Sequence, residues 1–371
     1  MTHPLTLRDR ARGSLLGLAC GDSLGAQVEF LARDSFPPVT DLLGGGPHAL
    51  RPGDWTDDTS LAACLAESLV ACRGHDPLDQ LTRYQAWRRQ GHLSSKGHCF
   101  DIGGATGRAL DAFARTGAPY RTSDGQDGGN GSLMRLAPVA LAWWDDAPTA
   151  IAQAASQSRT THAHPAAVDA CRVMALLLVQ ALQGASKAAL LAAPRDVFAG
   201  LATPLHPDVQ PTVEAAYLGW ERGDVRSGGY AADSLAAACW CFARTETFEA
   251  CVLMAANLGQ DADTTAAIAG ALAGAHYGER AIPKDWRFHL WGHDWLTWHA
   301  EALGARGAEA WSVPGKPCPP LPNPARSGAQ TQHRVDGMIL GGAALVDRVT
   351  EVWLTAVMQA DEWGSEVPYI D

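Results

Sequence analysis

Three features of the sequence predict an all-α fold. Over the first 304 of the 371 residues, apolar residues recur at three- and four-residue spacing, which is the period of a helix with one buried face. The alternation of apolar and polar residues that is typical of strands is scarce, and strands do not alternate with helices as in a parallel sheet. No repeat recurs at a fixed period. We therefore expect a multi-helix domain over residues 1–304.

The expected helices follow one another along this domain. Residues 14–20 are rich in Leu and suit a buried helix; the arginines before them resemble the start of a lipoprotein signal, but the apolar run is too short for export. Further helical stripes are Leu61, Leu65 and Leu69, then residues 168–184 and 233–242, and finally Ile268, Leu272 and Ala275. The last helix is so rich in Ala and Gly that its neighbours must approach closely.

Two loops and a tail separate or follow these helices. Residues 41–54 and 121–131 are dense in Gly, Asp and Pro, and such loops often display functional groups. Prolines crowd the segment 313–324, which we interpret as a linker. Residues 339–371 carry an amphipathic helical pattern with Trp353 and Trp363 and are too few to fold alone. We expect residues 305–371 to form a Pro-rich linker and a helical tail packed on the domain.

Composition and charge limit the classes of partner. A formal net charge of -11 argues against an extended nucleic-acid surface, because such surfaces need an excess of Lys and Arg, and it favours divalent cations instead. No stretch of about 18 uninterrupted apolar residues predicts a membrane span. The nine cysteines form no CxxC pair, and five lie in apolar stretches: Cys20, Cys64, Cys171, Cys239 and Cys251. We expect these five cysteines to be small buried residues, and a reducing cytoplasm to be the location of the protein. We also expect a monomer.

Two acidic clusters each occupy the turn that opens an apolar helix. They are Thr56-Asp57-Asp58 and Asp261-Ala262-Asp263-Thr264. Helix capping alone could explain either cluster, since Asp and Thr satisfy the exposed N–H groups of a helix start. Four aspartates in two such turns exceed what capping requires, because gathering like charges costs free energy unless a cation offsets it. Ligands that offer only oxygen favour Mg²⁺, and the lack of His and Cys disfavours zinc.

A third segment combines glycines with an asparagine just before an apolar helix. It contains Gly129, Asn130, Gly131 and Ser132. Such a turn exposes backbone N–H groups at a helix start, which can bind phosphate, although a flexible surface turn has the same composition.

Two acids and two histidines outside these clusters are further candidates. Glu29 and Asp101 each lie among apolar and Gly residues, where a carboxylate needs a partner; each could cap a helix or pair with an arginine. His162 and His164 lack a third ligand nearby and so make a poor zinc site. A histidine that contacts a ligand, or a structural histidine, fits them better.

Taken in order, these segments resemble the ADP-ribosylglycohydrolase family, which includes the dinitrogenase reductase-activating glycohydrolases and the ADP-ribosyl-acceptor hydrolases. Residues 13–30 are similar to the family's opening helix and its GDxxG element followed by a Glu. The other matching segments are Thr56-Asp57-Asp58-Thr59, residues 129–135, Thr161-His162 and residues 259–265. The resemblance runs from about Leu7 to about Gly304. Gln260 departs from it, because many relatives have Gly or Asn there, and so does Ser132, where Ala or Gly is common.

The resemblance implies a centre of two Mg²⁺ ions, with Mn²⁺ as the alternative. Its ligands would be Thr56, Asp57, Asp58, Asp261, Asp263 and Thr264. It also implies that Glu29 gates or assists the cleft and that Asp101 lies beside the ribose. The residues that would contact the rest of the ligand are Gly129, Asn130, Gly131, Ser132 and His162.

The activity that this resemblance implies is hydrolysis of the bond between C1″ of the distal ribose and an acceptor atom of an ADP-ribosylated protein or small molecule. ADP-ribosyl-arginine is the favoured substrate, by analogy with bacterial relatives. We expect Glu29, Asp58 and Asp101 to carry the catalysis, with Glu29 or Asp58 managing protons. The alternative is a non-catalytic ADP-ribose-binding or toxin-neutralising protein that uses the same pocket or the tail. The intact set of ligands favours the enzyme.

Overall fold

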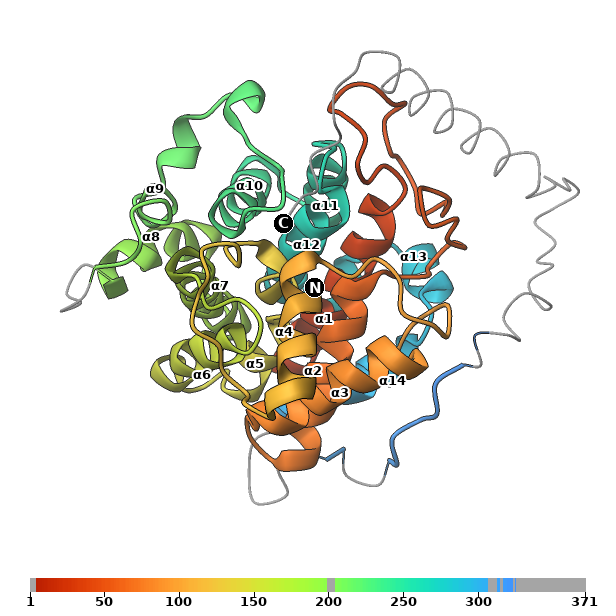
Figure 1. Cartoon of the computed structure of the whole chain (residues 1–371). Helices are drawn as coiled ribbons and strands as arrows, with labels where there is room; N and C mark the ends of the chain where they lie inside the picture. Colours follow the sequence, from red (N-terminus) through yellow and green to blue (C-terminus); the bar gives the residue numbers. More distant parts are fainter. Residues whose placement is uncertain (1–4, 199–203, 306–311, 314–315, 323, 325–371) are drawn as a thin grey trace, which may run out of the picture.

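Helices make up the regular structure of the described part of the chain. The computed structural model describes residues 5–198, 204–305, 312–313, 316–322 and 324. Within these ranges there are isolated β-bridges but no strand, so the all-α prediction is confirmed. The elements, labelled where room allows in Figure 1, are α1 (Leu7–Gly25), α2 (Asp57–Cys72), α3 (Pro77–Gln90), α4 (Gly104–Thr116), η1 (Asn130–Ser132), α5 (Ala137–Ala142), α6 (Ala147–Arg159), α7 (Pro165–Leu182), α8 (Lys187–Phe198), α9 (Gln210–Val213), η2 (Ala216–Gly219), η3 (Arg222–Asp224), α10 (Ala231–Arg244), α11 (Phe248–Ala256), α12 (Ala262–Tyr277), η4 (Glu279–Ala281), α13 (Lys284–His289) and α14 (His293–Gly304).

Helices α1 and α12 lie side by side near the middle of the domain (Figure 1), and their backbones touch at small residues. A Cβ atom built on Gly17 would lie 2.3 Å from the carbonyl oxygen of Gly270. One built on Gly13 would lie 2.2 Å from that of Gly274. Because glycine has no Cβ, the two helices approach more closely than larger residues would allow. The close approach predicted for the Ala- and Gly-rich helix is confirmed.

This pair of helices runs antiparallel, which decides what gathers at one end of it. Gly25, the last residue of α1, meets Ala262, the first residue of α12. Helix α2 begins at the same end, because the backbone N–H of Thr56 donates to the carboxylate of Asp22, in the last turn of α1, at 3.0 Å. The starts of α2 and α12 therefore lie together beside the end of α1.

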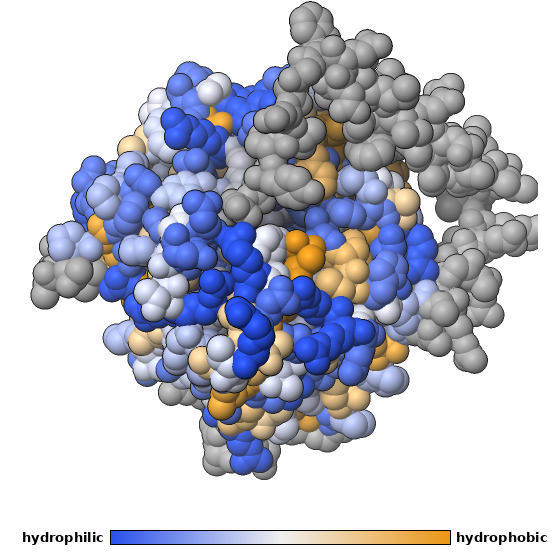
Figure 2. Space-filling view, in the orientation of Figure 1, coloured by the Kyte–Doolittle hydropathy of each residue, from blue (hydrophilic) through white to orange (hydrophobic). Residues whose placement is uncertain are grey.

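The core is apolar and rich in alanine, whereas the face seen in Figure 2 is mostly hydrophilic, with hydrophobic residues gathered near its centre. Helix α7 is long and apolar enough to cross a membrane by length and composition, but 83% of that stretch is buried against other helices of the domain. It is therefore a core helix. The five cysteines predicted to be buried are all buried and free, which confirms that prediction.

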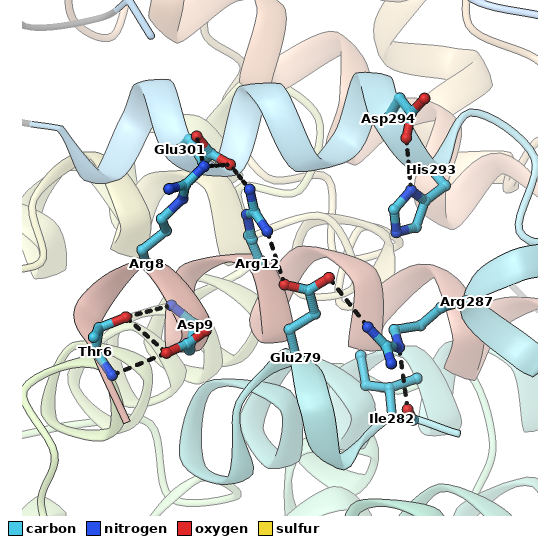
Figure 3. A network of polar contacts seen from close by, with 10 residues as sticks. All are labelled: Thr6, Arg8, Asp9, Arg12, Glu279, Ile282, Arg287, His293, Asp294 and Glu301. Atoms are coloured by element: carbon cyan, nitrogen blue, oxygen red, sulfur yellow. Dashed lines mark hydrogen bonds and ion pairs between the residues drawn. The ribbon is translucent and has the colours of Figure 1, made fainter. Parts of the chain in front are cut away.

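A network of ion pairs fastens α1 to the last helices of the domain (Figure 3). Glu301 on α14 lies between Arg8 and Arg12 of α1, and the Arg8 contact is 2.8 Å long. Arg12 also reaches Glu279 at 3.0 Å, and Glu279 binds Arg287 at 3.2 Å. The network joins α14 and the segment after α12 to α1.

Parts of the described Pro-rich segment contact the domain. The indole N–H of Trp298 donates to the carbonyl of Lys316 at 2.8 Å, and Leu321 packs against the core. Pro324 lies 3.4 Å from where a Cβ on Gly97 would be. The segment predicted to be a linker thus contacts α14 and the loop before α4. The amphipathic helix predicted for residues 339–371 lies outside the described residues.

Candidate active site and metal centre

The first acidic cluster is anchored by a buried aspartate of α1. Asp22 accepts hydrogen bonds from the backbone N–H of Thr56 and of Thr59, both at 3.0 Å, and from the Thr59 hydroxyl at 2.6 Å. Burial raises the pKa of Asp22 to about 6, despite these hydrogen bonds, which lower it. Asp22 belongs to the GDxxG element, and the sequence pattern predicted no role for it. The signal that could have found it is a single aspartate in the apolar second half of α1.

The two acidic clusters, about two hundred residues apart in sequence, meet at this end of the helix pair. The hydroxyl of Thr56 lies 3.5 Å from Oδ2 of both Asp58 and Asp263. The hydroxyl of Thr264 donates to Oδ2 of Asp58 at 3.3 Å. If each cluster only capped its own helix, the two clusters would not need to lie together. The sequence prediction grouped these residues, and the fold places them together.

Two carboxylate oxygens in this group have no hydrogen-bond partner among the described residues. Oδ1 of Asp58 and Oδ1 of Asp263 are buried and accept no hydrogen bond from the described residues. Burial, followed by the neighbouring carboxylates, raises the pKa of both side chains well above the ordinary value, and the same holds for Asp57. Buried oxygens without donors are costly to leave bare. Oxygen donors of this kind fit a hard divalent cation.

The glycine-rich turn is tied directly to the second acidic cluster. The side-chain amide of Asn130 donates to Oδ2 of Asp261 at 2.6 Å and to the hydroxyl of Ser234 at 2.9 Å. The backbone N–H of Asn130 donates to the carbonyl of Gly229, just before α10, at 2.9 Å. The Asn130 side chain therefore orients a carboxylate, and the turn is the short helix η1 followed by α5.

The side chain of Ser132, in the same turn, points into the core. Its hydroxyl is 2.8 Å from that of Ser158, and the residue is fully buried. The Ser132 hydroxyl is therefore directed into the core, away from any ligand at this turn. Gly129 and Gly131 have no side chains, so the turn could contact a ligand only through backbone groups, such as the N–H groups that helix starts present.

Glu29 and Asp101 meet at a histidine. Nε2 of His48 lies 3.2 Å from Oε2 of Glu29 and 3.3 Å from Oδ1 of Asp101. Burial alone would lower the pKa of His48, but the hydrogen bonds with Asp101 and Glu29 outweigh it and raise the pKa to about 10. A helix cap or an arginine partner was the alternative reading of these two acids; among the described residues both instead contact His48. No local pattern marked His48, although it lies in a loop predicted to display functional groups.

Three strained backbone positions lie around this group. Phe30, Asp101 and Gln260 all adopt left-handed backbone conformations, with φ of 64°, 56° and 59°. The N–H of Phe30 donates to the carbonyl of Gln260 at 2.8 Å, and the N–H of Gln260 donates to Leu31 at 2.7 Å. Gly or Asn would adopt this conformation more easily than Gln260 does, so the departure from the family pattern places a less suited residue at a left-handed position. Strain held in this way is typical of functional sites.

The two candidate histidines have different surroundings. His162 is buried, and its ring lies against Gly131 of the glycine-rich turn. His164 borders a pocket of about 280 Å³ beside the same turn, together with Gly128, Gly129, His206, Asp208 and Tyr230. Within the described residues neither histidine joins a group of three or more metal-ligating side chains.

The fold and the site define an all-α protein whose buried carboxylates gather at two helix starts beside a glycine-rich turn. Its residues 3–312 match the family model described as ADP-ribosylglycohydrolase. The chain therefore belongs to the ADP-ribosylglycohydrolase family, and it is an enzyme that removes ADP-ribose.

Individual relatives agree with this assignment. The chain is 38% identical to the ADP-ribosylarginine hydrolase Tri1 of Serratia proteamaculans, over 75% of this chain and 74% of that protein. It is 40% identical to the protein of the same name from Pseudomonas putida, over 75% and 73%. It is 34% identical to the ADP-ribosyl-[dinitrogen reductase] glycohydrolase of Rhodospirillum rubrum, over 77% and 91%. A solved structure titled "ADP-ribosylglycohydrolase-related protein complex" matches with a TM-score of 0.72 and 46% identity, over 80% of this chain and 98% of that one.

Proposed function

We propose that this enzyme is a magnesium-dependent hydrolase that releases ADP-ribose from ADP-ribosyl-arginine by cleaving the C1″ glycosidic bond. The observation that carries the metal is the pair of buried oxygens, one on Asp58 and one on Asp263, that lack a partner among the described residues. The arginine acceptor is supported by the names of two relatives, which are ADP-ribosylarginine hydrolases. The carboxylates of Glu29 and Asp101 also suit a guanidinium, which forms charge-assisted hydrogen bonds with carboxylates.

Six residues would hold the metal. They are Thr56, Asp57, Asp58, Asp261, Asp263 and Thr264. Two Mg²⁺ ions, when bound, would hold the ribose hydroxyls and lower the pKa of a bound water. The protein's own contribution is orientation: Asp22 fixes the start of α2, and Asn130 fixes Asp261. Partners that orient a metal ligand commonly affect metal affinity and activity strongly.

The remaining candidate residues would contact different parts of the substrate. The backbone of Gly129, Gly131 and Ser132, and the ring of His162, would receive the diphosphate. Asp101 would lie beside the ribose. Glu29 or Asp58 would accept or supply a proton at the bond being cleaved as an oxocarbenium-like transition state forms. His48 holds Glu29 and Asp101 close together against their mutual repulsion.

The first test follows ADP-ribose release from an ADP-ribosylated arginine with and without Mg²⁺. We expect Asp263→Asn to lose at least about a hundredfold in rate, because it removes one charge and one oxygen from the site. The matched control is Asp54→Asn, which changes a buried aspartate that pairs with Arg51 at 2.8 Å and is not a proposed ligand. Equal activity in Asp263→Asn and wild type would overturn the metal assignment.

A thermal unfolding experiment tests the metal without relying on activity. We expect Mg²⁺ to raise the melting temperature of the wild type, since a ligand that binds the folded state stabilises it. In a chelator, Asp263→Asn should melt higher than the wild type, because one of several buried like charges is gone. Added Mg²⁺ should then change it little. A wild type whose melting temperature ignores Mg²⁺ and Mn²⁺ would contradict the proposal.

The same assay separates the enzyme from a binding module. A wild type that binds ADP-ribose but releases none from arginine, serine or nucleic-acid acceptors would support the binding alternative. Release from arginine alone would establish the acceptor.

A further inference from the structure

Arg135 is a fully buried arginine that pairs with no carboxylate in the described part of the chain. Its guanidinium donates to Oε1 of Gln157 at 3.1 Å and to the hydroxyl of Thr161 at 2.8 Å, and it stacks on the ring of Tyr84 at 4.8 Å. Its Nη1 atom is buried without a hydrogen-bond partner among these residues. Buried charges are normally paired, so an unpaired one requires an explanation.

The hydroxyl of Thr161 connects Arg135 to His162. Arginine can only donate, so the Thr161 oxygen accepts from it. The same oxygen lies 2.8 Å from Nδ1 of His162. Thr161 is fully buried, and Nδ1 is the acceptor that the described residues offer to its hydroxyl hydrogen. A buried hydroxyl that donated to nothing would be costly, so Thr161 donates to Nδ1, and the hydrogen of the His162 ring lies on Nε2.

The other side of the His162 ring faces the glycine-rich turn. A Cβ atom built on Gly131 would lie 3.1 Å from Nε2 and 2.8 Å from Cε1 of His162. No hydrogen bond to Nε2 is present within the described residues, so this N–H is free for a ligand at the turn. Gln157 completes the connection, because its amide donates to the carbonyl of Ser132 at 2.9 Å while its oxygen accepts from Arg135.

The charge state of His162 agrees with this arrangement. Burial, followed by the nearby charge of Arg135, lowers the pKa of His162 to about 3. The ring is therefore neutral at ordinary pH and has one N–H to offer. In a neutral imidazole, the contact made by one nitrogen decides which nitrogen carries the hydrogen.

We propose that Arg135 and Thr161 are positioning residues that hold His162 as the tautomer with its hydrogen on Nε2, so that His162 donates to the diphosphate bound at the glycine-rich turn. The ligand half of this inference rests on the proposed function. The buried charge of Arg135 then also favours the dianionic diphosphate from behind the turn. A purely structural role would instead make the Arg135 network a clamp that joins the turn to the loop after α6.

Thr161→Val is the decisive variant, because it keeps the shape of the side chain and removes the hydroxyl. In the full-length protein without ligand, ¹H–¹⁵N correlation of the histidine side chains reports which ring nitrogen carries hydrogen. We expect the Nε2–H form of His162 in the wild type and loss of that form, wholly or in part, in Thr161→Val. Thr161→Ser keeps a hydroxyl and should restore the wild-type signature.

The part of the proposal that concerns the ligand is tested by measuring the affinity for ADP-ribose by calorimetry. We expect Thr161→Val to raise the Kd by about tenfold, which corresponds to a weakened hydrogen bond to a charged group. Because His162 would contact the diphosphate and not the cleaved bond, KM should rise while kcat stays near the wild-type value. The matched control is Thr160→Val, since Thr160 is buried and accepts from Arg135 at 3.4 Å without touching His162. It should change the melting temperature but neither the tautomer nor the Kd.

The outcomes separate this inference from the proposed function. An Nδ1–H form of His162 in the wild type, or an unchanged tautomer in Thr161→Val, would overturn the positioning of His162 by Arg135 and Thr161, whether or not ADP-ribose binds. An altered tautomer with an unchanged Kd overturns the ligand half. A wild type that shows the expected tautomer, lost in Thr161→Val, but does not bind ADP-ribose contradicts the proposed function. The positioning of His162 by Arg135 and Thr161 would still be confirmed.

Discussion

Asn130 donates a 2.6 Å hydrogen bond to Asp261 across 131 residues of sequence. This contact joins the glycine-rich turn to the start of α12, where the second acidic cluster lies. One side chain therefore couples the proposed phosphate turn to the proposed metal centre. A substitution in the glycine-rich turn should therefore affect metal binding, and a substitution in the metal centre should affect the turn.

Asn130→Ala tests this coupling. Removing the amide takes away the 2.6 Å hydrogen bond that orients Asp261, so we expect the Mg²⁺ requirement to rise about tenfold or more and kcat/KM to fall similarly. Activity measured over a Mg²⁺ titration reports both effects.

Asn257→Ala is the matched control, because the Asn257 amide likewise donates two hydrogen bonds, here to the carbonyls of Val39 and Leu253, and none to a proposed ligand. It should lower the stability and keep the wild-type Mg²⁺ requirement. The same Mg²⁺ requirement in Asn130→Ala as in wild type would show that Asp261 needs no such support.

The prediction for His48 follows from its position between two carboxylates. His48→Gln keeps a polar side chain and removes the positive charge that offsets the repulsion between Glu29 and Asp101. We expect kcat/KM to fall about tenfold. His98→Gln, which changes an exposed histidine of a nearby loop, should leave it unchanged. An equal loss in both variants would point to a general disturbance of the loops.

Sequence patterns found the fold class and grouped the six proposed metal ligands, because periodicity and helix-start chemistry are local. Asp22 and His48 were missed because their roles are tertiary. Asp22 matters only once α1 packs beside the start of α2, and His48 only once its loop folds over Glu29. The glycine turn was found, but the inward direction of the Asn130 side chain depends on Asp261, which follows 131 residues later.

Glu301 gives a prediction of pH dependence. Burial alone would raise its pKa, but hydrogen bonds from Arg8 and Arg12 outweigh that effect and lower the pKa below the ordinary value. A carboxylate with a lowered folded-state pKa stabilises the fold above its unfolded pKa, about 4.3, and this stabilisation is lost as the pH falls through the folded-state value.

We therefore expect Glu301→Gln to lower the free energy of unfolding by about 1 kcal/mol at pH 7, a modest effect because Arg8 is solvent-exposed. The difference from wild type should shrink between about pH 5 and pH 3 as the carboxylate is protonated. Urea unfolding at several pH values measures it. Glu249→Gln, at an exposed position in the first turn of α11, should show a smaller trend, because an exposed carboxylate at a helix start contributes only weakly through the helix dipole. A difference that stays constant with pH would mean that the ion pairs contribute nothing at neutral pH.

The contact between α1 and α12 gives the sharpest prediction about the fold. A Cβ on Gly270 would lie 2.1 Å from the carbonyl oxygen of Gly17, so Gly270→Ala must push the two backbones apart. We expect a loss of about 3 kcal/mol in the free energy of unfolding, at the upper end for overpacking because the obstacle is backbone. Gly107→Ala, on α4, meets only Ile102 at 4.0 Å and should gain up to about 1 kcal/mol from higher helix propensity. Because α12 also carries Asp263 and Thr264 at its start, Gly270→Ala should weaken the stabilisation by Mg²⁺ as well, whereas Gly107→Ala should leave it intact. Equal urea midpoints for the two variants would show that the α1–α12 backbone contact does not limit the packing.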